Sequence, residues 1–371
     1  MAHDEHSIPG AAAPGDLCRL RERIDAIDRE LLQLLGERAR CAEEVARVKR
    51  AEEADPVFYR PEREAEILHR VRAENPGPLS GDAVVRLFRE IMSECLALEH
   101  PLTVAYLGPE GTFTHLAARK HFGQAVTTTP LPAIDAVFGA VETGRAQFGV
   151  VPIENSSEGV VTHTADCFMD SSLQICGEVV MPIHHHLLSH AEDLAQVRRV
   201  LAHAQALGQC RQWLDAHLPQ AEREAVSSNA RAAEVAAKDP QSAAIASRVA
   251  AEHYQVPLRA AHIEDRADNT TRFLVIGSVT TEATGADRTS LMLSTANRPG
   301  SLYELLKPIA EAGISLSRIE SRPSRCAQWT YVFFLDLVGH QHDPDVRACL
   351  EALRETADTV KVLGSYPQAA T

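Results

Sequence analysis

Two residues that could do chemistry stand just before an apolar run near residue 270. Thr271 and Arg272 precede Phe273 and the apolar residues 274–276, which predict a buried strand. The ends of such strands hold small ligands in many α/β proteins. A guanidinium can bind a carboxylate through two hydrogen bonds, and a hydroxyl can pass a proton to a leaving oxygen. The same pair often stands at a strand end without a function, so the surrounding segments must decide.

A glycine-rich turn supplies a second candidate for binding an anion. The apolar residues 103–107 predict a strand, residues 108–114 form the turn and include Thr112, and a helix is expected from His115. The first backbone N–H groups of a helix are unpaired and attract anions. The turn lacks the lysine of a P-loop and the spacing of a dinucleotide fingerprint. We therefore expect it to hold a carboxylate rather than a nucleotide.

The order of elements in the central segment predicts an α/β domain of two lobes. A helix at 133–143 and a strand at 148–153 follow the turn, and polar residues 154–159 again stand at the carboxyl end of the strand. A second lobe is expected from Ile183, and the chain then returns to the first lobe through residues 263–265. The elements predicted for the second lobe are a strand at 197–202, a helix after Gln205, and helices at 230–238 and 243–254.

Three adjacent histidines, residues 184–186, raise the question of a metal site. Neighbouring residues of a strand point to opposite faces of the sheet, so these three rings cannot converge on one ion. We therefore favour an arrangement in which the three histidines do not together bind one metal ion over a metal site formed by all three.

The segment before residue 102 is predicted to be all helical. Apolar residues recur at helical spacing from Leu17 to Val48, which predicts one long helix. A second helix is expected from Pro61, since proline suits a first turn, and a third after Ser80. Three such helices enclose a poor core by themselves, so we expect the long helices of two chains to pack together.

Arg38 and Lys49 are candidates for binding an anion on the long helix. They are eleven residues apart, which is about three turns, so they share one face and have Ala42 and Val45 between them. Cations on a long helix more often simply face solvent. The pattern alone leaves both possibilities open.

The C-terminal segment, residues 287–371, predicts a small α+β domain. Its order is βαββαβ, which is typical of small ligand-binding domains. Strands are expected at 290–294, 314–320, 329–337 and near 360–364, with one helix ending at Ala312 and another starting near Pro344.

Composition restricts the class of protein. The 371 residues suffice for two or three domains, and the net charge of −14 argues against a nucleic-acid or membrane-surface partner. Eight scattered cysteines without a C-x-x-C pair indicate free thiols in a reducing cytoplasm. Residues 1–15 are expected to be a disordered tail rather than a signal peptide, and no apolar run approaches membrane-spanning length.

The central segment resembles the prephenate dehydratase family. The resemblance rests on G-P-E-G-T-F-T at 108–114, on the pair Glu154 and Asn155, and on T-R-F at 271–273. It implies two α/β lobes around a cleft, as in periplasmic binding proteins, with Thr271 as the catalytic group. Protonation of the ring hydroxyl of prephenate lets water leave as carbon dioxide departs, which needs no cofactor. The side chains that the resemblance assigns to substrate binding are Thr112, Asn155, Gln209, Arg272 and Phe273.

The helical segment resembles the all-helical chorismate mutase family. The matching residues are those at 20–22, 27–28, 31–32, 37–38, 49 and 62–64. The resemblance implies an intertwined dimer in which Arg38 and Lys49, with Arg21 of the partner, bind the carboxylates and ether oxygen of chorismate. Arg63 would support this site and Glu64 would bind the substrate hydroxyl.

The third helix of this segment departs from the mutase family at two positions. Cys95 stands where serine is common, and Glu99 stands where glutamine is common. The two residues are four apart, so they share one helix face, which the resemblance assigns to the mutase site. Glu99 is thereby a candidate catalytic residue and Cys95 a candidate substrate contact.

The C-terminal segment resembles the ACT regulatory domain of phenylalanine-sensitive dehydratases. The matches are to the family motifs G-A-L and E-S-R-P, and they imply a site for L-phenylalanine in which Gly300 lets the ligand approach the backbone. A purely structural dimerisation module is the alternative. The residues assigned to the phenylalanine site are Gly300, Ser301, Leu302, Glu320, Ser321, Arg322 and Pro323.

The three resemblances together imply one multidomain enzyme of phenylalanine biosynthesis. It would convert chorismate to prephenate and prephenate to phenylpyruvate, act in the cytoplasm as a homodimer or larger oligomer, and be inhibited by L-phenylalanine. We expect no cofactor and no metal. The alternatives are a dehydratase with an inactive mutase domain and a non-catalytic small-molecule sensor. The expected parts are a tail at 1–15, a mutase domain at 16–101, a dehydratase domain at 102–282 and an ACT domain at 287–371.

Overall fold

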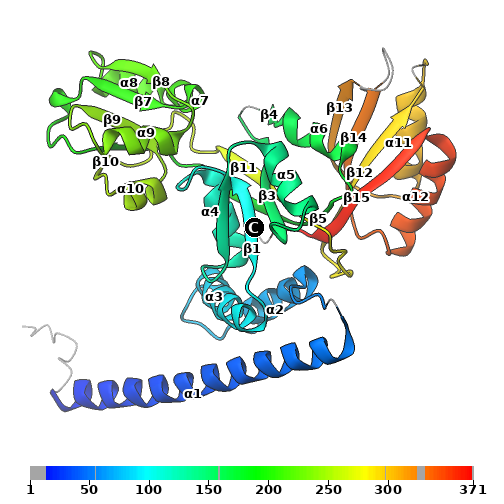
Figure 1. The fold of residues 1–371 in the computed structure, drawn as a ribbon, viewed down its shortest axis with the longest axis horizontal. Coiled ribbons are helices and arrows are strands. Elements are labelled where there is room, and N and C mark those ends of the chain that lie inside the picture. Colours follow the sequence, from blue (N-terminus) through cyan, green and yellow to red (C-terminus); the bar gives the residue numbers. More distant parts are fainter. Residues whose placement is uncertain (1–13, 55, 158, 297, 324–330, 370–371) are drawn as a thin grey trace, which may run out of the picture. The chain divides into compact units, whose positions relative to one another are not determined.

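The structure, a computed structural model, describes residues 14–54, 56–157, 159–296, 298–323 and 331–369 (Figure 1). The chain divides into two compact units, which are described separately. The first comprises residues 1–58 and 95–100, and the second comprises residues 59–94 and 101–371. The predicted tail lies outside the described residues except for its last two, with which the first helix begins. No helix in the described part of the chain is long and apolar enough to cross a membrane.

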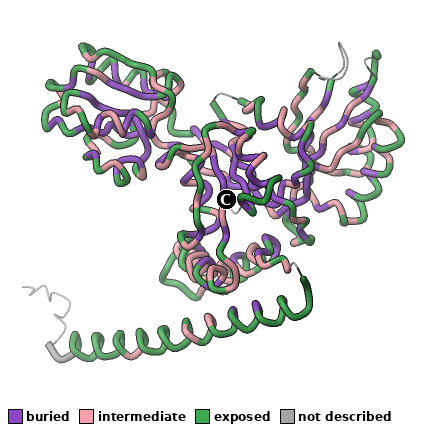
Figure 2. The backbone as a smooth tube through the Cα atoms, in the orientation of Figure 1, coloured by how far each residue is buried: buried purple, intermediate pink, exposed green. Residues whose placement is uncertain are grey.

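The first unit is built on one long helix, α1 (Pro14–Glu52), as the apolar spacing predicts. Within a single chain much of its apolar stripe is exposed, with Leu20 at 60% and Leu32 at 69%. Ala42 and Ala46, farther along the helix, are buried. Figure 2 shows this helix as a mostly green tube, in contrast to the purple strands of the sheets.

Two shorter helices follow α1, as predicted. Helix α2 (Pro61–Ala73) begins with a proline, whose missing N–H would be unpaired there in any case. Helix α3 (Gly81–Glu99) is preceded by Ser80, whose hydroxyl accepts a hydrogen bond from the N–H of Ala83 at 3.2 Å.

The first lobe of the second unit is a mixed sheet in the order β2-β1-β3-β11-β5, with β4 paired to β3. Strand β1 is parallel to both of its neighbours, whereas β11 runs antiparallel between β3 and β5. The predicted strands at 103–107 and 148–153 and the helix at 133–143 are confirmed. The elements are β1 (Thr103–Leu107), α4 (Phe113–Phe122), β2 (Thr127–Leu131), α5 (Ile134–Glu142), β3 (Phe148–Asn155), β4 (Gly159–Val160), α6 (Thr162–Asp170), β5 (Gln174–Pro182) and β11 (Thr270–Gly277).

The second lobe is a sheet in the order β10-β6-β9-β7-β8. The chain enters this lobe between β5 and β6 and leaves it between β10 and β11, so two connections join the lobes. Its elements are β6 (His186–Ser189), a 3₁₀ turn (Leu194–Gln196), β7 (Arg199–Ala202), α7 (Ala204–Gln209), α8 (Arg211–His217), β8 (Glu222–Ala225), α9 (Asn229–Ala236), β9 (Ser242–Ala246), α10 (Arg248–Tyr254) and β10 (Leu258–Ala260).

The predicted helix at 243–254 is wrong in its first part. Residues Ser242–Ala246 form β9, which lies between β6 and β7 and is buried at every position. The alanines there favour a helix by intrinsic propensity, but burial in the middle of a sheet overrides that weak preference. Helix α10 starts only at Arg248, after Ser247 caps it by accepting from the N–H of Ala250.

The C-terminal domain has the predicted βαββαβ order, in a sheet arranged β13-β14-β12-β15. The first residues of the strand predicted at 329–337 lie outside the described part of the chain. The elements are β12 (Asp287–Thr295), α11 (Ser301–Glu311), β13 (Leu316–Pro323), β14 (Tyr331–Val338), α12 (Pro344–Thr356) and β15 (Thr359–Pro367).

This domain shares a hydrophobic core with the first lobe. Phe168 and Ile175 of the lobe belong to the same buried cluster as Phe334 and Leu363 of the C-terminal domain. At Gly364 the φ angle is 150°, and a Cβ atom would lie only 2.1 Å from the carbonyl oxygen of Ile175. Only glycine allows β15 and β5 to approach this closely.

Candidate active site

A cleft of about 330 Å³ lies in the second unit, lined by residues of both lobes. The first lobe contributes the glycine-rich turn and the start of α4, the end of β3, strand β4 and the start of β11. The second lobe contributes helix α7 and the starts of α9 and α10. Among the lining residues are five of the predicted site, namely Thr112, Asn155, Gln209, Thr271 and Phe273.

The hydroxyl of Thr271 is held in place from the neighbouring strand. Asn155 lies directly across from Thr271 in the β3–β11 pair, and its Nδ2 donates to Thr271 Oγ1 at 2.8 Å. Among the described residues Thr271 has no acceptor for its own hydroxyl hydrogen. Because Thr271 lines the cleft and its oxygen already accepts from Asn155, its hydrogen is available to a bound molecule.

The hydrogen bonds continue from Asn155 to the opposite side of the cleft. Asn155 Nδ2 also donates to Asn269 Oδ1 at 2.8 Å, and Asn269 Nδ2 donates to Gln209 Oε1 at 3.2 Å. Gln209 Oε1 lies 2.8 Å from Nε2 of His185, which burial keeps neutral by lowering its pKa. This network fixes Thr271 relative to Gln209 of the second lobe.

Two members of this network were not predicted. Asn269 directly precedes β11, and in this part of the chain the sequence singled out only Thr271, Arg272 and Phe273 of the strand itself. His185 is the middle one of the three adjacent histidines, and it lines the cleft. His185 lies three residues after the end of β5 and directly before β6, and this position could have indicated a place between the lobes.

Helix N-termini provide positive potential to the cleft. The residues preceding α4, α7, α9 and α10 all line it, and each accepts a hydrogen bond from its own helix: Thr112, His203, Ser228 and Ser247. No lysine or arginine is among the described residues that line the cleft. An anion bound there would therefore be held by hydroxyls, amides and helix ends rather than by a guanidinium.

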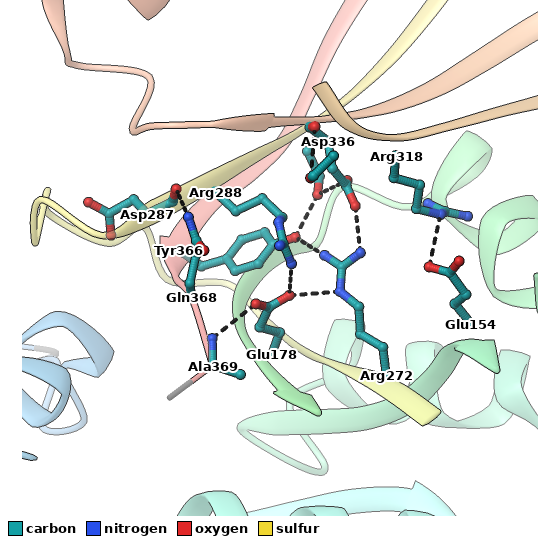
Figure 3. Close-up of polar contacts among 12 residues, drawn as sticks. Glu154, Glu178, Arg272, Asp287, Arg288, Arg318, Asp336, Tyr366, Gln368 and Ala369 are labelled. Atoms are coloured by element: carbon teal, nitrogen blue, oxygen red, sulfur yellow. Dashed lines mark hydrogen bonds and ion pairs between the residues drawn. The ribbon is translucent and has the colours of Figure 1, made fainter. Parts of the chain in front are cut away.

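The prediction that Arg272 binds a substrate carboxylate is wrong for this structure. Successive residues of β11 point to opposite faces, so Thr271 and Phe273 line the cleft while Arg272 points away from it. Its guanidinium donates to Glu178 at 2.7 Å, to Asp336 at 2.5 Å and to the hydroxyl of Tyr366 at 2.8 Å (Figure 3).

The environment of Arg272 is a buried ionic network between the first lobe and the C-terminal domain. The side chains of Glu178 and Asp336 are only 2% and 3% exposed. Arg288 also pairs with Glu178 (Figure 3). Ser290 donates to Asp336 at 2.6 Å. Burial would raise the pKa of Asp336, but the charges of Arg272 and Arg318 hold it below its ordinary value. Glu178 is the single acidic residue of the largely apolar strand β5, and its presence there could have indicated a buried ion pair.

A second ion pair joins the C-terminal domain to the strand of Asn155. Arg318 of β13 lies 3.7 Å from Glu154 of β3, and its side chain is 9% exposed (Figure 3). Glu154 precedes Asn155, so its side chain points to the other face of β3. The strands that carry Asn155 and Thr271 thus both contact the C-terminal domain through charged side chains.

The first unit places Lys49 beside Glu99, and it also contains the predicted mutase residues Arg38 and Cys95. Lys49 Nζ lies 4.0 Å from Glu99, and it donates to the carbonyl oxygens of Val57 and Phe58. Burial raises the pKa of Glu99, while the charges of Lys49 and Arg38 oppose that rise. Cys95 is buried one turn before Glu99.

The remaining mutase residues are placed as follows. Arg21 is exposed on α1 and lies 17 residues before Arg38, a rise of about 26 Å along the helix. Glu64, in the second unit, is paired with Arg89, and burial raises its pKa against the effect of that arginine. Arg63 forms a surface pair with Glu66 at 2.9 Å.

The predicted phenylalanine-binding residues occupy two places in the C-terminal domain. Gly300, Ser301 and Leu302 begin α11, where Gly300 has a φ of 91° and no atom lies within 4 Å of the position of a Cβ. Ser301 donates to the backbone of its own loop, to Ala296 at 2.7 Å. Glu320, Ser321, Arg322 and Pro323 form the end of β13, and Arg322 is paired with Asp166 of α6 at 2.9 Å.

The fold and cleft define a two-lobed α/β domain with a C-terminal α+β regulatory-type domain and an N-terminal helical segment. Residues 20–100 match the family of chorismate mutase type II, residues 104–281 that of prephenate dehydratase, and residues 289–355 that of the ACT domain. The predicted multidomain fold is thereby confirmed.

Similar proteins share this arrangement over nearly the whole chain. A bifunctional chorismate mutase/prephenate dehydratase of Pseudomonas aeruginosa is 55% identical over 354 residues, covering 94% of this chain and 97% of the relative. Another from Neisseria gonorrhoeae is 51% identical over 352 residues, covering 94% and 96%. The solved prephenate dehydratase from Arthrobacter aurescens in complex with L-Phe is 36% identical with a TM-score of 0.68, covering 72% and 90%. The chain belongs to the bifunctional chorismate mutase/prephenate dehydratase family.

Proposed function

We propose that this chain converts chorismate to prephenate and prephenate to phenylpyruvate, with Thr271 as the acid of the second reaction. The observation that carries the assignment is the orientation of Thr271. Its oxygen accepts from Asn155, so its hydrogen is available to the cleft. A hydroxyl donor at this point is what dehydration of prephenate requires.

The dehydration balances without a cofactor. The bond between the quaternary ring carbon and its carboxylate breaks, carbon dioxide leaves, and the electron pair of that bond enters the ring. The hydroxyl on the opposite ring carbon leaves with its own bonding pair and takes a proton, giving water. Thr271 gives that proton, and solvent restores it. The aromatic ring of phenylpyruvate is the driving force.

Helix ends would hold the two carboxylates of prephenate. The cleft offers the N-termini of α4 and α9 instead of a cationic side chain. Such ends stabilise an anion without placing a mobile charge beside the leaving group. Gln209 and Asn155 would orient the substrate relative to Thr271 through the network that joins them.

A direct assay tests the two activities together. The full chain is incubated with chorismate, and the formation of prephenate and then of phenylpyruvate is followed. Both products are expected. Phenylpyruvate only from added prephenate would indicate an inactive mutase domain, and no conversion of either compound would indicate a sensor.

The mutase site would combine residues of two chains. A helix with an exposed apolar stripe as long as that of α1 needs a partner, and a second α1 offers a matching surface. Arg21 and Arg38 are about 26 Å apart on one helix, too far to touch one substrate. Arg21 of one chain would therefore join Arg38, Lys49 and Cys95 of the other. The resemblance to the mutase family also assigns Arg63 and Glu64 to binding chorismate.

Mixing two inactive variants checks this arrangement. Arg21→Ala and Arg38→Ala should each abolish mutase activity. Refolded together in equal amounts, they should recover about a quarter of the wild-type activity, because half of the dimers are mixed and each mixed dimer has one intact site. Refolding each variant alone is the control. No recovery in the mixture would show that Arg21 serves its own chain.

The pH dependence of the mutase should report on Glu99. The ether oxygen of chorismate gains negative charge in the transition state, so Glu99 can help only when protonated, since a carboxylate cannot donate a hydrogen bond. Burial raises the pKa of Glu99, and the protonated fraction grows as pH falls. Mutase kcat/KM should therefore rise as pH falls from about 8 toward 5.

The variant Glu99→Gln separates protonation of Glu99 from other effects of pH on the enzyme. The amide donates at every pH, so the variant should be faster at neutral pH and have a flat profile. The dehydratase activity of the same protein is the internal control, since its cleft does not contain Glu99. Identical flat profiles for both proteins would mean that Glu99 does not contact the ether oxygen.

The C-terminal domain would bind L-phenylalanine and inhibit the dehydratase. The related prephenate dehydratase from Arthrobacter aurescens was solved with L-Phe. In this chain Gly300 leaves open space at the start of α11, and the satisfied hydroxyl of Ser301 turns into its own loop. The ligand would contact Gly300, Ser301 and Leu302 on one side and the end of β13 on the other. We place the enzyme in the cytoplasm, where thiols stay reduced, because free thiols are described at Cys18, Cys41, Cys95, Cys176, Cys210 and Cys349.

A further inference from the structure

A cluster of two histidines and one glutamate lies where the chain passes between the lobes of the second unit. His184 is in the connection from β5 to β6, and His262 and Glu264 are in the connection from β10 to β11. These are the two connections of the lobes. The cluster joins His184 to two residues that are distant from it in sequence.

The three side chains have the spacing of metal ligands. Nδ1 of His184 lies 2.8 Å from Oε1 of Glu264, and Nδ1 of His262 lies 3.4 Å from the same oxygen. All three ligand atoms lie within 4.8 Å of one another. Bonds of about 2.0–2.2 Å in a tetrahedral zinc site place the ligand atoms roughly 3.3 Å apart, so only small side-chain movements are needed.

The cluster is fixed on one side and open on the other. The side chain of Glu264 is 3% exposed, and its second oxygen accepts from the N–H of His185 at 2.9 Å. His184 and His262 are 36% and 55% exposed, so an ion and a water molecule can reach them. A buried carboxylate that is held by the backbone is a preorganised ligand.

His262 is presented to the cluster by an unusual backbone conformation. Its φ angle is 54°, in the left-handed region that residues other than glycine rarely adopt. His186 supports this conformation, because its Nδ1 accepts from the N–H of His262 at 3.2 Å. Residues in such conformations are often found at ligand sites. A simple ion pair between His184 and Glu264 would not require a second imidazole on the same oxygen.

We propose that His184, His262 and Glu264 bind a divalent transition metal, with zinc as the ion that fits best. Two imidazoles and one carboxylate form a known zinc ligand set, with water in the fourth position. The ion would tie together the two connections of the lobes and so restrict their relative motion. The metal ion would take no part in the two proposed reactions, and the metal site does not depend on those reactions being correct.

Metal titration of the full chain tests the site. Protein freed of metal with a chelator is titrated with Zn²⁺ by calorimetry and with Co²⁺ by visible absorption. One ion per chain is expected to bind at micromolar concentration, with the absorption of tetrahedral cobalt and without the thiolate-to-cobalt bands that cysteine ligands produce. Zn²⁺ should also raise the melting temperature, since it binds the folded state.

Two variants and a matched control locate the ion. His262→Asn removes an exposed imidazole and keeps a residue that tolerates the left-handed conformation, and Glu264→Gln removes the charge. Each should weaken binding by at least roughly tenfold. His190→Asn changes an exposed histidine at the far end of β6 and should bind like the wild type. If Glu264→Gln does not fold, His262→Asn alone decides. Absence of saturable binding, or equal binding by His262→Asn and His190→Asn, would overturn the proposal.

Discussion

Replacing Thr271 with valine is expected to lower dehydratase kcat by roughly 10²–10⁴-fold, the range that a positioned proton donor contributes. Valine has the same branched shape and fits the same buried position, where Thr271 is 8% exposed. It removes only the hydroxyl that accepts from Asn155 and faces the cleft. The KM for prephenate should change much less, because the carboxylates are held elsewhere.

The control for this variant is the preceding residue. Thr270→Val makes the same chemical change at a position that does not line the cleft, and dehydratase activity should be close to that of the wild type. Mutase activity should be unchanged in both proteins, because Arg38, Lys49 and Glu99 belong to the other unit. If Thr271→Val lost both activities, or neither, Thr271 could not be the acid of a separate dehydratase site.

The elements that position Thr271 could be predicted because their patterns are local. Strand β1, the glycine-rich turn and the start of α4 follow one another in the chain. Strand β3 is an apolar run that ends in polar residues, and β11 is an apolar run that begins with them. The pairing of β11 with β3 places Thr271 opposite Asn155, although 115 residues separate them in sequence. Short motifs identified both residues before the pairing was known.

The surroundings of Arg272 could not be predicted in the same way. Its partners Glu178, Asp336 and Tyr366 come from three different strands, two of them in another domain. A guanidinium after a catalytic threonine suggests a substrate contact, but alternation along β11 directs it to the opposite face. Likewise the sequence predicted a helix where β9 lies. The position of β9 between two strands depends on the tertiary structure, and an alanine-rich sequence does not indicate it.

Replacing Arg272 with methionine should destabilise the second unit by about 3–5 kcal/mol, the usual cost of removing one partner from a buried ion pair. The side chain of Arg272 is 12% exposed, and it neutralises two carboxylates that are buried almost completely. Methionine is of similar length and leaves Asp336 and Glu178 without this partner. Calorimetric unfolding of the full chain measures the loss.

Arg199 provides a matched comparison. It also pairs with two carboxylates, Glu224 and Asp239, but its side chain is 39% exposed and lies on the surface of the second lobe. Arg199→Met should therefore destabilise the protein much less than Arg272→Met, because surface ion pairs contribute little to stability. Equal losses of unfolding free energy in the two variants would show that burial does not increase the contribution of the Arg272 network to stability.

The loss in Arg272→Met should depend on pH in a definite direction. In the wild type the pKa of Asp336 is below its ordinary value, so the stabilising contribution of this carboxylate is present above a pH of about 4 and disappears as pH falls through the lowered pKa. Without Arg272 this contribution is greatly reduced, so the stabilities of the two proteins should differ most at neutral pH. Below about pH 4 protonation removes the buried charge in the variant, and the difference should narrow. A difference that stays constant from pH 7 to pH 4 would mean that the variant loses packing rather than charge compensation.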